Sequence, residues 1–145
     1  VGVSSTSAIH GAARNISYAH SKTGMLGMTR ALAVELARYG ITVNSIVPGW
    51  IETDMTAGAF GYQRFVDNVM PRIPHRRWGQ PQDFGGIAVY LASDESSFVT
   101  ASTFVVDGSE HAARRVLVRP GCSLAIVRRS AWARDGGRAA GARGP

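Results

Sequence analysis

The chain has 145 residues, of which 45% are hydrophobic, so it is long enough for one soluble domain with a core. Its formal net charge of +6 is unevenly distributed. Residues 1–110 carry eight basic and nine acidic side chains, whereas residues 111–145 carry eight arginines and one aspartate. The excess of basic side chains therefore says nothing about partners of the first 110 residues.

Several absences also narrow the class of protein. No apolar run approaches the roughly 18 residues of a membrane span, and no signal peptide is recognisable. Cys122 is the only cysteine, which excludes an intrachain disulfide and gives no thiolate metal site. We expect a protein of a reducing compartment, the cytoplasm.

The first half of the chain predicts a strand and a long helix. The β-branched residues of VGVSS predict a buried strand that ends in small polar residues, and the stretch through Asn15 is predicted to be a loop. From about Ile16 to Tyr39, apolar residues recur at three- and four-residue spacing, which predicts one helix. Gly40 stands where a C-terminal cap belongs.

Two more strands follow. Residues 41–47, ITVNSIV, predict a strand that Pro48-Gly49 ends, and residues 102–108, STFVVDG, predict another. Residues 50–79 are predicted to be irregular or weakly helical, and a helix is expected from Pro81 onward. Strands that alternate with helices favour an α/β fold with a parallel sheet and consecutive right-handed crossovers.

The composition changes after about residue 110. The remaining segment is rich in arginine, glycine and alanine and has no sustained hydrophobic period. We therefore predict a domain over residues 1–110 and a disordered, arginine-rich tail over residues 111–145.

Lys22 is the only lysine among 16 basic residues, and it follows Tyr18 by four positions. The two side chains are expected to share one face of the long helix. A phenol, with a pKa of about 10, is a poor acid or base near neutrality, but a nearby ammonium favours the phenolate. The compact lysine head could also donate to the hydroxyls of a bound ribose. Ser5 ends the first strand, where open α/β sheets place ligands.

Several spaced motifs carry a family resemblance. Ser5, Tyr18 and Lys22 match the Ser…Tyr-x-x-x-Lys pattern of short-chain dehydrogenases/reductases, and Asn44, Pro48-Gly49 and Thr53 match their N-x-x-x-P-G-x-x-x-T pattern. Their late R-x-G, L-A-S-D and V-D-G-G stretches correspond to residues 77–79, 91–94 and 106–109. Residues 1–110 thus resemble the C-terminal half of that family.

The resemblance implies the C-terminal half of a Rossmann-like, doubly wound parallel sheet, with three strands and crossover helices. It implies that Tyr18 is the general acid or base, that Lys22 assists it and holds the nicotinamide ribose, and that Ser5 polarises a carbonyl. NAD or NADP would be the cofactor and a small carbonyl or alcohol the substrate. The positions expected to hold the nicotinamide end are Pro48, Gly49, Ile51 and Thr53. A homodimer or homotetramer is expected for the complete protein.

Plainer interpretations stand beside these. Ser5 could simply end a strand, Pro48-Gly49 could be only a turn, and Thr53 could be only a helix cap. Asn44 is expected to be a structural hydrogen-bonding residue. By resemblance His10 could face the substrate, but an exposed loop histidine is the favoured interpretation. The aromatic residues at 50 and 60–65 could line a substrate lid, although such residues more often pack on one another.

The sequence also departs from the family. It shows no glycine-rich strand-to-helix turn for the pyrophosphate, no asparagine upstream of Ser5, and Ser109 where the second glycine of V-D-G-G is usual. An alternative is therefore a truncated or frame-damaged fragment without activity, whose first strand exposes an apolar edge. A third hypothesis, less favoured, is that the arginine-rich tail binds nucleic acid or another polyanion.

Overall fold

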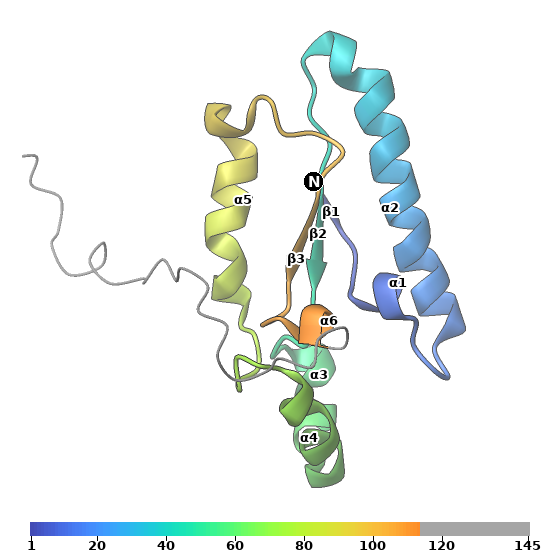
Figure 1. The fold of residues 1–145 in the computed structure, drawn as a ribbon, viewed down its shortest axis with the longest axis vertical. Helices are drawn as coiled ribbons and strands as arrows, with labels where there is room; N and C mark the ends of the chain where they lie inside the picture. The colour runs from blue at the N-terminus through green and yellow to red at the C-terminus, as the bar shows by residue number, and fades with distance from the viewer. Residues whose placement is uncertain (114–145) are drawn as a thin grey trace, which may run out of the picture.

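The computed structural model describes residues 1–113, so the predicted tail from residue 114 onward lies outside the described residues. Strands β1 (Gly2–Val3), β2 (Ser45–Pro48) and β3 (Thr103–Val106) form one parallel sheet in the order β1-β2-β3 (Figure 1). Gly2 lies opposite Ser45, and Ser45 lies opposite Thr103. The predicted α/β class and parallel sheet are confirmed.

Strand β2 begins later than the sequence predicts and includes Pro48. Just before Ser45, side-chain hydrogen bonds stand beside the backbone bonds from Gly2 N to Asn44 O and from Ala101 N to Val43 O. Val43 donates its N–H to the Thr100 hydroxyl, while the amide of Asn44 donates to Val99 O and accepts from Ser102 N. Asn44 is 1% exposed, so its expected structural role is confirmed.

The long helix is confirmed as α2 (Ile16–Leu36), followed by a 3₁₀ turn, η1 (Ala37–Tyr39). Gly40 ends it in the left-handed conformation, with φ of +71°. The helix packs on the sheet through a buried hydrogen bond of 2.6 Å between the Thr29 and Ser45 hydroxyls. Met25 of the helix lies against Gly2 of β1, where a Cβ would be 3.4 Å from its Sδ.

The predicted loop before Asn15 is wrong in part, because it contains a short helix, α1 (Ser7–His10). The Ser5 hydroxyl accepts from the Ser7 N–H and starts the turn, and Thr23 of α2 donates to Ala8 O. His10 is consequently half-buried at the end of α1 and is not an exposed loop residue.

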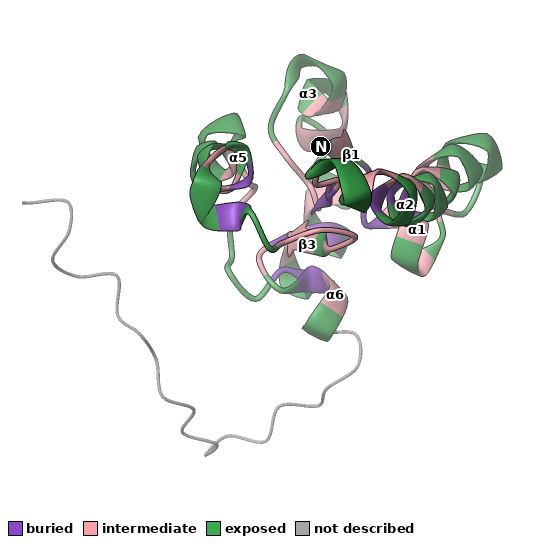
Figure 2. Ribbon diagram, turned by 90° about the horizontal axis from the view of Figure 1, so that it is seen from above, coloured by how far each residue is buried: buried purple, intermediate pink, exposed green. Residues whose placement is uncertain are grey.

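The prediction of two consecutive right-handed crossovers is wrong, and the second connection is the exception. Helix α5 (Gly85–Ala92) follows the 3₁₀ turn η3 (Pro81–Phe84) and precedes η4 (Asp94–Ser96). Helices α2 and α5 lie on opposite faces of the sheet (Figures 1 and 2). Since both crossovers step in the same direction across the sheet, only one of them can be right-handed. The second connection contains two additional helices, so it is not the compact unit to which the handedness rule applies.

These additional helices, α3 (Asp54–Phe60) and α4 (Gln63–Val69), form a hairpin that η2 (Met70–Arg72) follows. The hairpin lies beyond the carboxyl ends of the strands, as does α6 (Glu110–Ala113) (Figure 1). Residues 50–79 are thus more helical than the sequence predicts. We call residues 54–69 the α3–α4 hairpin.

The core is small and centred on β2. Val47 and Ile46 of this strand are 0% and 5% exposed and point to opposite faces of the sheet. Leu26 and Ala33 of α2 and Leu91 of α5, the helices on the two faces, are also buried. In β1, by contrast, Val3 is 53% exposed and the preceding Val1 67%. The predicted apolar edge is therefore confirmed, whereas the prediction of a buried first strand is wrong for these side chains. Among the described helices, none is long and apolar enough to cross a membrane.

Candidate active site

Tyr18 and Lys22 lie together at the carboxyl end of β1. The Lys22 ammonium donates to Val3 O over 2.9 Å and lies 5.6 Å from the centroid of the Tyr18 ring. The Ser4 hydroxyl, in turn, donates to Lys22 O over 2.8 Å, which fixes this turn of α2 on the strand end. Tyr18 is 37% exposed, so part of this residue faces solvent.

Ser5 belongs to the same edge. Its hydroxyl is half-buried and accepts from the Ser7 N–H over 3.1 Å. The next residue, Thr6, donates its N–H to Pro48 O over 2.9 Å, which joins the loop after β1 to the end of β2. The structure therefore brings Ser5 and Pro48, from segments far apart in the sequence, to neighbouring strand ends.

Gly49 is required by close packing between two strand ends. It donates its N–H to Val106 O over 3.0 Å, and a Cβ at this position would lie 2.6 Å from Asp107 Cβ. No side chain fits at that distance without movement of the backbone.

Gly49→Ala is therefore expected to lower the free energy of unfolding by about 1–3 kcal/mol, the usual cost of overpacking. Gly86→Ala is the matched control, because a Cβ there meets nothing within 4 Å inside α5. Alanine in a helix interior should cost nothing or add stability. Denaturant unfolding of the full-length protein measures both changes, and equal stabilities would contradict the packing argument.

Ile51 and Thr53 lead from β2 into α3. Ile51 pairs with Gly79 in a parallel bridge, through Glu52 N to Gly79 O at 2.8 Å and Gly79 N to Trp50 O at 2.9 Å. Thr53 stands at the N-cap of α3 and donates its N–H to the Thr56 hydroxyl, which donates to Ile51 O. The helix-cap interpretation of Thr53 thus agrees with the structure.

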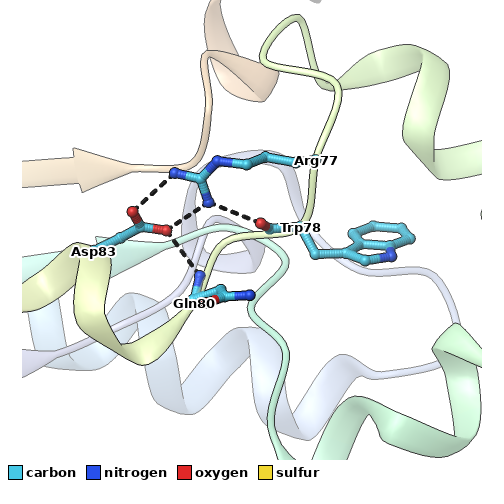
Figure 3. Close-up of polar contacts among 4 residues, drawn as sticks. All are labelled: Arg77, Trp78, Gln80 and Asp83. Carbon is cyan, nitrogen blue, oxygen red and sulfur yellow. Dashed lines mark hydrogen bonds and ion pairs between the residues drawn. The ribbon is translucent and has the colours of Figure 1, made fainter.

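An ion pair that the sequence did not predict fixes the loop before α5. Arg77 donates to both carboxylate oxygens of Asp83, over 2.7 and 2.8 Å, and to Trp78 O over 2.9 Å (Figure 3). The Gln80 N–H also donates to Asp83. Hydrogen bonds from Arg77 and then from Gln80 hold the pKa of Asp83 well below its usual range. The sequence signal that could have predicted this ion pair is the presence of opposite charges six residues apart, on either side of Pro81.

A cleft of about 340 Å³ lies beside this loop, at the end of β3. Four of its polar side chains pair with each other, because Arg77 binds Asp83 and His111 Nδ1 lies 2.8 Å from an Asp107 oxygen. Its apolar lining includes Trp50, Ile51 and Ile73. Within residues 1–113, no group of three or more His, Cys, Asp or Glu side chains could hold a metal ion.

Four aromatic rings pack together beside the cleft. Trp50 and Trp78 come from the paired segments around Ile51 and Gly79, and Phe60 and Phe65 come from the α3–α4 hairpin. The packing interpretation of the aromatic residues at 50, 60 and 65 agrees with this cluster. Trp78 is a member that the sequence did not predict.

Comparison with known proteins decides the family. The sequence profile described as Enoyl-(Acyl carrier protein) reductase matches residues 1–109. A 3-oxoacyl-(acyl-carrier-protein) reductase, FabG, from Thermotoga maritima is 43% identical over 108 residues. This chain belongs to the short-chain dehydrogenase/reductase family. The match to FabG covers 74% of this chain and 43% of that protein, so the chain spans less than half the length of such relatives.

Solved structures of the family have the same fold. A protein described as an NAD(P)-dependent gluconate 5-dehydrogenase from Beutenbergia cavernae, with NADP bound at low occupancy, superimposes with a TM-score of 0.73 at 38% identity. That match covers 76% of this chain and 44% of the other. A 4-hydroxyisoleucine dehydrogenase in complex with NADH gives a TM-score of 0.73 at 34% identity, over 76% and 45% of the two chains. The predicted Rossmann-like class is therefore confirmed.

Proposed function

We propose that the full-length protein carrying this chain is an NAD(P)-dependent oxidoreductase of small carbonyl or alcohol substrates. The observation that supports it most is the Tyr18–Lys22 pair, anchored by Lys22 to Val3 O at the carboxyl end of β1. Relatives whose names denote reductases and dehydrogenases, and neighbours solved with NADP or NADH, support the same class of activity.

The side chains at this edge fit the nicotinamide end of NAD or NADP. The Lys22 ammonium can donate to ribose hydroxyls, and the partly exposed Tyr18 has its ring centroid 5.6 Å from that ammonium. The segment that we propose to contact the nicotinamide comprises Pro48, Gly49, Ile51 and Thr53, and Thr6 ties it to the Ser5 loop. When bound, the cofactor supplies or accepts the hydride.

The residues of this chain would then move the proton and orient the substrate. In reduction, Tyr18 gives its hydroxyl proton to the carbonyl oxygen, and in oxidation its phenolate takes the alcohol proton. The Lys22 ammonium places a positive charge 5.6 Å from the centroid of the Tyr18 ring. The Ser5 hydroxyl donates to the carbonyl oxygen and holds it near Tyr18, while its own oxygen still accepts from Ser7 N.

The proposal also includes the oligomeric state of the protein and its place in the cell. Helix α2 exposes apolar side chains at Ile16, Met28 and Val34, which supports burial of this surface in a homodimer or homotetramer or by further parts of the protein. We propose a cytoplasmic protein with residues 1–110 as the domain and residues 111–145 as an arginine-rich tail. The exposed edge of β1 supports the alternative that residues 1–145 alone are inactive.

Ser5→Ala tests the site on the full-length protein. If Ser5 polarises the carbonyl, kcat should fall by about 10²–10³, the cost of one lost donor at a developing oxyanion. Ser7→Ala removes a hydroxyl two residues away and should leave kcat nearly unchanged. NADH or NADPH consumption with small ketones measures both. Equal turnover by the two variants would contradict the role of Ser5.

A further inference from the structure

Few buried side chains hold the α3–α4 hairpin in place. Helix α3 has no buried residue, and α4 has only one, Val69. The segment leaves β2 and returns to α5 through two short stretches that pair with each other, at Ile51 and Gly79. It is therefore closed at its base by backbone hydrogen bonds, and its position must come from side-chain contacts.

The paired base carries two of the rings that contact the hairpin. Trp78 stacks on Phe60 with ring centroids 4.1 Å apart and an interplanar angle of 5°, and lies 6.2 Å from Phe65. Trp50 meets Phe65 edge-to-face at 5.0 Å. The four half-buried rings thus connect the base to α3 and α4.

Trp78 is the better anchored of the two tryptophans. On one side of it, Arg77 is bound to Asp83 and to Trp78 O, and on the other side Gly79 is bound to Trp50 O. Figure 3 shows the indole on the side of the loop away from the ion pair. The loop therefore holds the Trp78 indole in a fixed position. Phe60, its stacking partner, belongs to α3.

We propose that Trp78 is a positioning residue that sets the place of the α3–α4 hairpin over the carboxyl ends of β1 and β2 by its stack on Phe60. This inference rests on the proposed function where it concerns substrate. The hairpin begins at Thr53, directly after the segment proposed to hold the nicotinamide. Its position then determines how closely substrate is held against Tyr18, and so affects KM more than kcat.

The test compares Trp78→Leu, Trp78→Phe and Phe98→Leu in the full-length protein. Phe98 lies between η4 and β3, outside the hairpin and the aromatic cluster, is fully exposed, and serves as an aromatic-to-leucine control. Hydrogen exchange of amides 54–69 should quicken about tenfold in Trp78→Leu, the scale of a lost aromatic pair. Amides of β2 should not change, and Trp78→Phe should restore most of the protection.

Steady-state kinetics supplies the second measurement. Trp78→Leu should raise KM for the carbonyl substrate about tenfold with a smaller change in kcat, and Phe98→Leu should change neither. Unchanged exchange in the hairpin, equal acceleration in β2, or an unchanged KM would overturn the proposal. If the wild-type protein consumes neither NADH nor NADPH, the proposed function fails, and the exchange experiment alone decides whether Trp78 positions the hairpin.

Discussion

Tyr18→Phe is expected to abolish nearly all turnover while the protein still binds its cofactor. The substitution removes only the hydroxyl, and the ring that lies 5.6 Å from the Lys22 ammonium is retained. A positioned general acid or base contributes about 10²–10⁴ to the rate, so kcat should fall by about that factor. Steady-state assays with NADH and NADPH measure kcat, and fluorescence titration measures the dissociation constant of the cofactor.

Tyr39→Phe is the matched control for this result. Tyr39 follows the same helix at its far end, and its hydroxyl accepts from Arg38 at the surface. Its variant should retain full turnover. Near-normal turnover in Tyr18→Phe, or a parallel loss in both variants, would contradict the assignment of Tyr18 as the proton donor.

Lys22→Arg is expected to be nearly as damaging, although it conserves the charge. The ammonium of Lys22 is a compact donor that reaches Val3 O over 2.9 Å beside the Tyr18 ring. A planar guanidinium is larger and donates in a fixed fork, so it cannot take the same place between strand end and phenol. We expect kcat to fall on the order of 10²-fold, the scale of one lost electrostatic group in a site.

Arg30→Lys is the reverse substitution on the same helix. Arg30 is exposed, and its variant should have normal kcat and stability. If Lys22→Arg also turned over normally, the charge alone would suffice at this position. The presence of a single lysine among 16 basic residues would then need no chemical reason.

Much of the fold was predictable because it depends on local signals. The spacing of apolar residues and the glycine after Tyr39 predicted helix α2, and the β-branched stretches predicted β2 and β3. The start of β2 was not predictable in this way. It depends on the side chain of Asn44, whose partners Val99 and Ser102 lie more than 50 residues away in the sequence.

The same distinction applies to the candidate site. The Tyr18–Lys22 pair lies on one helix, so its geometry follows from helical spacing alone. The ion pair of Arg77 with Asp83 and the stack of Trp78 on Phe60 join separate segments. The opposite faces of α2 and α5 likewise depend on how a long connection crosses the sheet, which no local pattern encodes.

The central claim is that the site around Tyr18 and Lys22 serves hydride transfer to a carbonyl carbon. The most direct test incubates the full-length protein with a ketone and with NADH or NADPH deuterated at the transferring position, and then analyses the alcohol by mass spectrometry. We predict that the alcohol carries one deuterium on its carbinol carbon and that Tyr18→Phe forms almost none of it. An alcohol without deuterium, or no alcohol from any ketone with either cofactor, would contradict the account.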